Sequence, residues 1–350
     1  MQKGRLHKES STPSSGRNTK KSQCRRRRNI LCLLCQVCLV IQFMVFSIFC
    51  VQKPGEKDFS FRKELEIGLL EGDKDYIFGQ ITDVKIDSLG NIFVLDVKMN
   101  KVVKYDRDGK YILRFGEKGV GPGEFEDPRS ITLDSSGRVC VLDFQKVIIF
   151  DEAGGLIKSF GLNFMGIDMA LNDKGNLLIL GARDNRLFHV YDNEGKYLYS
   201  FGDLVNSPKE FAGMKGASLF RTPLRLWANG KNIFVMNPYK YEIWLYEDEI
   251  LKGRLTRRLP DYLKPELRED APGGFSAVVS GNFIFEENNT IYVYYDGEKA
   301  SWLDVFEDGK LIISKQVKGI LSAIDDKGRF YFVESEDYSK ICRYSKNSGF

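Results

Sequence analysis

The chain alternates short apolar runs with short polar turns, and this alternation recurs six times. Each unit opens with a strand pattern, passes through a turn rich in Asp, Asn and Gly, and continues into an apolar run. The six runs are residues 92–95, 139–142, 177–180, 233–236, 291–295 and 330–333. Tandem units built from several short strands are typical of propeller blades. We therefore predict an all-β, six-bladed β-propeller over residues 59–350.

The apolar runs are not interrupted by polar residues, so both faces of these strands are expected to be covered. Blades packed face to face around a common axis meet this condition. The sixth unit holds only three strand patterns, whereas one spare pattern, residues 61–68, precedes the first unit. Pairing this strand with the last unit removes two open edges, which otherwise invite aggregation. The sequence thus predicts that the N-terminal strand closes the last blade.

Two adjacent stretches carry a family resemblance. Residues 121–128 read GPGEFEDP, and residues 131–143 read ITLDSSGRVCVLD. This arrangement resembles an NHL repeat, and residues 59–350 resemble the NHL-like six-bladed propellers of bacterial extracytoplasmic proteins. The match is specific in the first two units and good in the third, and only the strand pattern continues through the last three. The resemblance implies the fold but no single activity, since most such proteins have none assigned.

The N-terminal region has a different character. Residues 1–29 form a polar, basic leader, and residues 30–51 are almost wholly apolar. About 20 apolar residues suffice to span a bilayer. The four arginines at 25–28 are expected to stay on the cytoplasmic side, which places the propeller outside, in the periplasm or the extracellular space. We predict an uncleaved signal-anchor helix that tethers the propeller to the inner membrane.

Three alternatives to the signal-anchor remain open. A cleaved signal peptide, which would release a secreted propeller, normally has a shorter apolar core and small residues before the cut. Here Phe49 stands where a small residue is expected. Cys50 is a candidate for lipid attachment, although the residues before it fit that signal poorly. The true start of translation also has an alternative position downstream.

Charge divides at the same boundary. Residues 1–51 hold ten Lys and Arg against one acid, Glu9, whereas the remainder holds 42 basic and 47 acidic residues. Binding to a phosphate backbone depends on neutralisation by Lys and Arg. A mildly acidic propeller is a poor match for that requirement. We therefore predict no nucleic-acid partner.

Histidine is scarce in the propeller, where His189 is the only one. Six-bladed enzymes related to the NHL-like group, such as streptogramin lyases and amidating lyases, use several histidines as metal ligands or general bases. One histidine cannot build a three-histidine zinc site or a catalytic pair. His189 also lies inside a predicted strand, where a structural role is the more frequent one. The sequence therefore favours a protein that is not an enzyme.

Polar residues near the start of each innermost strand are expected to approach the propeller axis. The equivalent positions in the first five units are Asp83, Ser130, Asp168, Arg225 and Asn282. Such residues can line a channel that contains only water, or bind a polar ligand. Hard cations take carboxylate and amide oxygens, so Asp83 and Asp168 are the candidate ligands for Ca²⁺. No other cofactor is predicted, and Arg225 disfavours a cation unless it pairs with an acid.

Two insertions, residues 203–222 and 252–280, interrupt the compact repeat. Long loops on a rigid scaffold often carry recognition, so the second insertion supplies candidate residues for the rim of a binding face: Arg254, Arg257, Arg258 and Arg268. Interleaved acids in the same stretch also fit an ordinary solvated loop. Together these features predict a membrane-tethered, extracytoplasmic binding module for a protein, peptide or glycan. The alternative is a calcium-type hydrolase or lyase that uses the axial carboxylates.

Overall fold

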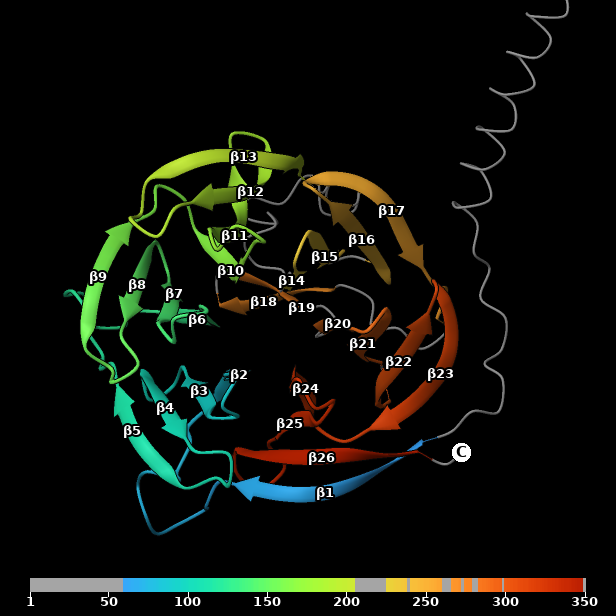
Figure 1. The fold of residues 1–350 in the computed structure, drawn as a ribbon, viewed down its shortest axis with the longest axis horizontal. Coiled ribbons are helices and arrows are strands. Elements are labelled where there is room, and N and C mark those ends of the chain that lie inside the picture. Colours follow the sequence, from blue (N-terminus) through green and yellow to red (C-terminus); the bar gives the residue numbers. More distant parts are fainter. Residues whose placement is uncertain are drawn as a thin grey trace, which may run out of the picture. The chain divides into compact units, whose positions relative to one another are not determined.

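The computed structural model describes residues 59–204, 225–237, 240–259, 266–271, 274–278, 283–297 and 299–348. These residues form six four-stranded antiparallel sheets and one two-stranded sheet. The four-stranded sheets are arranged as blades around a common axis (Figure 1). The predicted all-β, six-bladed propeller is therefore confirmed. No helix in the described part of the chain is long and apolar enough to cross a membrane, and the predicted span at 30–51 lies outside it.

In each of the first five blades, four consecutive strands run from the axis outward. Blade 1 contains β2 (Ile81–Ile86), β3 (Ile92–Asp96), β4 (Lys101–Tyr105) and β5 (Tyr111–Phe115). Blade 2 contains β6 (Pro128–Leu133), β7 (Val139–Asp143), β8 (Lys146–Phe150) and β9 (Leu156–Gly161). Blade 3 contains β10 (Gly166–Leu171), β11 (Leu177–Arg183), β12 (Arg186–Tyr191) and β13 (Tyr197–Asp203).

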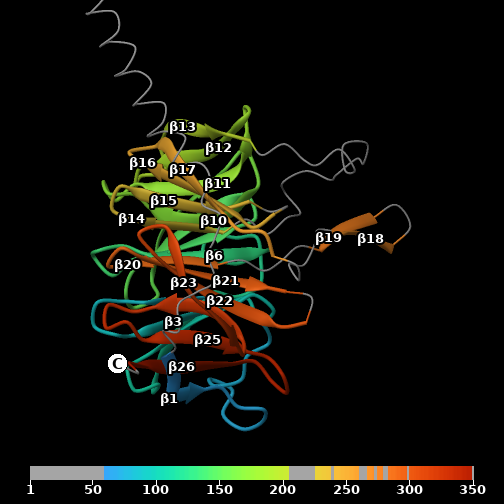
Figure 2. The same ribbon diagram turned by 90° about the vertical axis from the view of Figure 1, so that its right-hand side faces the viewer.

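The remaining blades follow the same plan. Blade 4 contains β14 (Leu226–Asn229), β15 (Asn232–Met236), β16 (Glu242–Glu247) and β17 (Ile250–Thr256). Blade 5 contains β20 (Phe283–Glu287), β21 (Thr290–Asp296), β22 (Ser301–Glu307) and β23 (Lys310–Val317). Blade 6 contains β24 (Ile320–Ile324), β25 (Phe330–Glu334), β26 (Lys340–Ser348) and β1 (Phe59–Ile67). In the sequence between blades 4 and 5, β18 (Glu266–Ala271) and β19 (Gly274–Val278) pair only with each other and project away from the blades (Figure 2).

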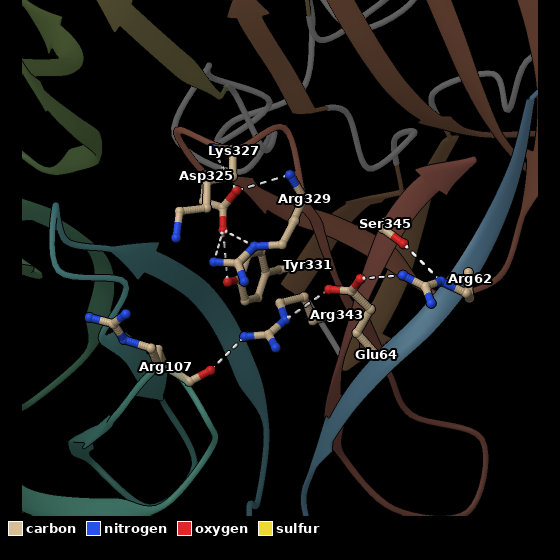
Figure 3. Close-up of polar contacts among 9 residues, drawn as sticks. All are labelled: Arg62, Glu64, Arg107, Asp325, Lys327, Arg329, Tyr331, Arg343 and Ser345. Atoms are coloured by element: carbon tan, nitrogen blue, oxygen red, sulfur yellow. Dashed lines mark hydrogen bonds and ion pairs between the residues drawn. The ribbon is translucent and has the colours of Figure 1, made fainter. Parts of the chain in front are cut away.

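The N-terminal strand β1 closes the ring, as predicted. It pairs antiparallel with β26, from Phe59 opposite Ser348 to Ile67 opposite Ile341. Arg343 on β26 extends the closure to blade 1, because its Nη1 donates to the carbonyl oxygen of Arg107 at 2.5 Å (Figure 3). Its Nε also lies 3.6 Å from a carboxylate oxygen of Glu64 on β1. One guanidinium thus joins both end strands to the first blade.

The hydrophobic core is divided among the interfaces between blades. In the described residues, six clusters of buried apolar side chains correspond to the six interfaces between neighbouring blades. The cluster at the closure packs Val84 and Ile92 of blade 1 against Tyr331 and Val333 of blade 6. Every residue of β3 and of β7 is buried. This burial confirms that both faces of the central strands are covered.

The outer strand of one blade packs on the outer turn of the next. Phe115, at the end of β5, lies against Gly154, and Phe160 of β9 lies against Gly195. Both glycines have positive φ, 80° and 78°. A Cβ at Gly195 would lie 2.6 Å from the Phe160 ring, closer than side chains approach. This contact explains why the repeat contains both a turn glycine and a phenylalanine at the end of the outer strand.

We expect Gly195→Ala to lower the free energy of unfolding by about 2–3 kcal/mol, because it adds a steric clash to the strain of positive φ. Gly175→Ala is the matched control: its φ is +74°, but nothing lies within 4 Å of the added methyl group. That variant should lose only about 1 kcal/mol. Urea unfolding followed by circular dichroism measures both changes. Equal losses would contradict packing of the outer strand on the next blade.

Candidate functional site

Three of the predicted axial residues, Asp83, Ser130 and Asp168, lie on innermost strands and are buried, whereas Arg225 lies directly before β14 and is half-buried. Asp83 is 4% exposed, Ser130 is 0% and Asp168 is 5%. Asn282 lies outside the described residues. A carboxylate buried to this degree needs hydrogen-bond donors to remain charged. The contacts of these side chains therefore decide what the axis can do.

Both carboxylates connect their own blade to the next. Asp83 Oδ2 accepts from the backbone N–H of Ile131 at 2.9 Å and from Ser130 Oγ at 3.3 Å, both in blade 2. Asp168 Oδ2 accepts from the N–H of Leu226 in blade 4 at 2.9 Å. The structure thus brings Asp83 and Ser130 together. Asp83 and Asp168 each form a hydrogen bond to the following blade.

The second oxygens of the two acids also have donors. Asp83 Oδ1 lies 2.6 Å from Lys85 Nζ, and Asp168 Oδ1 accepts from the N–H of Met169 at 2.8 Å. Calcium sites use six to eight oxygen ligands. Within the described part of the chain, no group of three or more His, Cys, Asp or Glu side chains is placed to hold a metal ion. The acids near the axis are therefore engaged in protein contacts, and two cations, Lys85 and Arg225, lie in the same wall.

A small cavity lies among the innermost strands of five blades. Its volume is about 20 Å³, which is room for roughly one water molecule. Strand alternation explains part of the wall, since Lys85 follows Asp83 by two residues and Trp227 follows Arg225 by two. The wall is completed by Leu226, Ile284, Phe285 and Ser322. We call this space the axial cavity.

His189 is a buried structural residue on β12. Its Nε2 lies 3.2 Å from the carbonyl oxygen of Gly181, and its ring lies against Phe164. Burial lowers the pKa of His189 below its usual value, so the ring is neutral at pH 7. Within the described part of the chain, no carboxylate or hydroxyl side chain forms a hydrogen bond with the His189 ring. The contacts of His189 are therefore those of a packed structural residue, and no described side chain is placed to act with it as an acid or a base.

The predicted rim arginines lie in different environments. Arg257, after β17, donates from Nη1 to both oxygens of Asp304 at 2.6 and 2.5 Å. Asp304 is fully buried on β22 and also accepts from the Tyr241 hydroxyl at 2.7 Å. The contacts of Arg257 and Tyr241 with Asp304 therefore connect blade 4 to blade 5. Arg258 is exposed, and the side chain of Arg268 on β18 is outside the described residues.

Arg254 has a different position, at a larger cavity between blades 3 and 4. Its guanidinium lies 5.4 Å from the centre of the Trp244 ring. The cavity has a volume of about 250 Å³ and is partly open. Its lining consists of Arg186, Gly202, Asp203, Leu204, Trp244, Tyr246, Glu249, Leu251 and Arg254. We call it the blade 3–4 pocket.

Sequence reasoning named one residue of this pocket, Arg254, and Asp203 and Leu204 fall at the start of the predicted insertion 203–222. Arg186 and Asp203 come from blade 3 and form an ion pair at 2.8 Å, whereas Trp244 and Leu251 come from blade 4. These residues are distant in the sequence and meet only because their blades are neighbours. The pocket's residues show no pattern of their own within the repeat. The residues of this pocket share only their position in the outer halves of blades 3 and 4.

The comparisons with known proteins agree with this architecture. A family model described as a domain of unknown function, DUF4934, matches residues 60–339. The chain belongs to the DUF4934 family. It is 32% identical over 83 residues to NHL repeat-containing protein 3 of Homo sapiens, covering 22% of this chain and 24% of that protein. It is 24% identical over 143 residues to Protein brain tumor of Drosophila melanogaster, covering 39% of this chain and 13% of that protein.

Solved structures confirm the fold of this DUF4934 member. A Bacteroides fragilis protein described as exported aligns with a TM-score of 0.57 at 13% identity, covering 86% of this chain and 98% of that one. A DUF4221 protein from Bacteroides vulgatus aligns with a TM-score of 0.55 at 9% identity, covering 84% and 100%. Identities this low show the fold alone. The six-bladed fold and the NHL-repeat relatives together support the predicted NHL-like propeller.

The contact of Asp168 with blade 4 predicts a stability effect that is independent of metal. Asp168→Ala leaves the buried N–H of Leu226 without an acceptor, which should cost about 1–3 kcal/mol of unfolding free energy. Asp173→Ala, at an exposed turn of the same blade, should change it by less than about 0.5 kcal/mol. Urea unfolding in EDTA and in CaCl₂ tests this. A loss seen only with calcium would instead support a cation at Asp168.

Proposed function

We propose that this protein is a membrane-tethered, extracytoplasmic propeller that binds a protein or peptide through the blade 3–4 pocket. The observation that carries the proposal is the chemistry of this pocket. Trp244 and Tyr246, which are 7% and 4% exposed, form the base of the pocket, Leu251 supplies an exposed aliphatic side chain, and the two arginines lie among acids. Pockets that combine aromatic anchors with arginine are typical of protein-recognition surfaces.

The size of the pocket supports a ligand side chain as the occupant. A volume of about 250 Å³ is near the lower end of the range for small-molecule sites, and it suffices for one large side chain. Neighbouring charges at Arg186, Asp203 and Glu249 offer polar contacts to the ligand backbone or to adjacent side chains. An apolar or aromatic residue flanked by polar groups therefore fits the pocket best.

The catalytic alternative has less support from the geometry. Hydrolysis or elimination needs a positioned acid, base or metal. The four oxygens of Asp83 and Asp168 accept hydrogen bonds from other protein groups, and His189 is bonded to a backbone carbonyl. The binding function needs none of these groups, so it is the function that the described residues favour.

The membrane tether is proposed from the sequence. The apolar segment 30–51 follows four arginines, and only residues 52–58 separate it from β1. The tether would thus join the propeller at the strand that closes blade 6. The basic leader would stay in the cytoplasm under the positive-inside rule, with the propeller on the opposite side.

We expect the full-length chain to remain in the membrane pellet after alkaline carbonate extraction. We also expect the propeller, but not the basic leader, to be accessible to protease added outside the inner membrane. The reason is that an uncleaved apolar segment of this length stays inserted. Mass spectrometry of the mature protein is the direct check. A soluble form that begins after residue 50 would show cleavage and contradict the signal-anchor.

A peptide-selection experiment tests the pocket. Full-length protein in detergent is used to select binders from a phage-displayed library of random peptides. We expect peptides with a central large apolar residue, whose affinity falls about tenfold in Leu251→Ser, a loss of about 1.4 kcal/mol. The matched control is Leu156→Ser, which changes the equivalent position of blade 2, with 44% exposure against 40% at Leu251.

The selected peptides should bind Leu156→Ser as tightly as the unmodified protein. Equal losses in the two variants would show that the peptides recognise outer strands in general and not this pocket. Failure to select any peptide, together with binding on a glycan array that Leu251→Ser abolishes, would replace the protein or peptide ligand with a glycan.

A further inference from the structure

A cavity with a basic wall lies at the closure, where blades 1 and 6 meet. Its volume is about 110 Å³, which is room for several water-sized groups. The wall contains residues 88–90 and Arg107 from turns of blade 1, together with Asp326, Lys327 and Arg329 from blade 6. Three cations thus share this wall with one acid. We call this space the closure pocket.

Two of the three cations have no ionic partner. Arg329 is paired with Asp325, whose Oδ2 lies 2.6 Å from Nη2 and 2.7 Å from Nε of the guanidinium. The side chains of Arg107 and Lys327 lie at the same closure (Figure 3), but in the part of the chain that the structure describes they form no ion pair and no hydrogen bond. One cation from each blade is therefore available to an anionic ligand.

The acids nearest to these cations in the sequence are used within their own turns. Asp106 Oδ1 accepts from two backbone N–H groups of its turn, at 2.9 and 2.8 Å. Asp325 Oδ1 accepts from the N–H of Lys327 at 3.0 Å. Side-chain capping of this kind stabilises a turn in one conformation. The turns thus hold the backbone of Arg107 and Lys327 in place without neutralising their side chains.

The closure pocket lies at the edge of blade 6 where the chain enters β1. Phe330, which follows the turn of Lys327, pairs with Tyr344, and Tyr344 pairs with Lys63 in the first half of β1. In the proposed tether, only residues 52–58 separate the apolar segment from β1. A linker of this length spans at most about 25 Å. The tether would therefore keep this edge of the blade near the lipid headgroups.

We propose that the closure pocket binds the phosphate group of an anionic phospholipid through the guanidinium of Arg107 and the ammonium of Lys327. The proposal rests on the proposed tether, which supplies the lipid surface. Arginine offers a planar set of donors to phosphate oxygens, and lysine offers a point charge. Leu89 belongs to the same wall and is 66% exposed, so an apolar contact with the lipid is available beside the two cations. Inorganic phosphate presents similar oxygens, and the experiments below separate the two sources.

Photo-crosslinking in liposomes tests the position of the contact. The full-length chain carries p-benzoylphenylalanine in place of Leu89 and is reconstituted with radiolabelled phosphatidylglycerol. We expect a lipid adduct at this position. The matched control is the same replacement at Leu70, which is 63% exposed but follows the opposite end of β1, and it should give no adduct. Equal adducts at the two positions would mean that no edge is preferred and would overturn the proposal.

Charge variants assign the adduct to the closure pocket. Arg107→Gln combined with Lys327→Gln should lower the adduct yield at position 89 about tenfold, because each cation at a membrane surface contributes to the attraction. The matched control is Lys174→Gln combined with Lys196→Gln, which removes two exposed cations from the corresponding turns of blade 3. That control should keep the yield. An equal loss in both double variants would indicate general attraction to anionic lipid and refute the pocket.

Two further measurements separate the source of the phosphate from the tether. Thermal unfolding of the full-length chain in detergent is compared in sodium phosphate and in sodium chloride at equal ionic strength. A higher Tm in phosphate that Arg107→Gln with Lys327→Gln abolishes, without a lipid adduct, would assign the pocket to free phosphate and overturn the lipid ligand. Flotation of the liposomes after carbonate treatment reports on the tether alone. A chain that floats without an adduct refutes the closure pocket, whereas a chain that does not float refutes the tether and the lipid ligand with it.

Discussion

In the described part of the propeller, every apolar cluster lies between two blades, so each blade buries its core only against its neighbours and the ring must close. Blade 1 and blade 6 meet through Val84, Ile92, Tyr331 and Val333 in the same way as any other pair. β1 pairs with β26 and adds Ile67 to this interface. Burial of apolar surface is the main favourable term in folding. Closure therefore supports the burial at all six interfaces.

Contacts between successive blades occur at two distances from the axis. Near the axis, Asp83 and Asp168 accept hydrogen bonds from the following blade. At the periphery, Phe115 and Phe160 pack on glycine turns of the following blade. These inner contacts are polar and these outer contacts are apolar, while Arg257 and Arg343 add polar contacts between blades away from the axis.

Local patterns were sufficient to predict the fold. The turn glycines, the uninterrupted apolar runs and the spare strand at 61–68 predicted six blades and their closure, and all of these were confirmed. Each of these signals lies within one repeat or follows from counting repeats. The sequence also placed Asp83, Ser130 and Asp168 on the innermost strands. Their burial and partners depend on the neighbouring blade, which the repeat pattern does not describe.

The candidate sites were harder to predict for the same reason. The ion pair of Arg257 with Asp304 joins residues 47 positions apart, and neither residue has a signal that points to the other. Ser322 reaches the axial cavity through a bulge, and a one-residue shift in strand pairing is not visible in an apolar run. Trp227 and Lys85 were accessible to reasoning, because strand alternation places them beside predicted residues.

The pairing of β1 with β26 also has a consequence for biosynthesis. Strand β1 is synthesised long before its partner β26, so it stays unpaired until nearly the whole chain has been made. An unpaired strand is an aggregation hazard unless charge protects it. The centre of β1 carries Arg62, Lys63, Glu64 and Glu66. Charges of this kind oppose edge-to-edge pairing of a strand that has no partner yet.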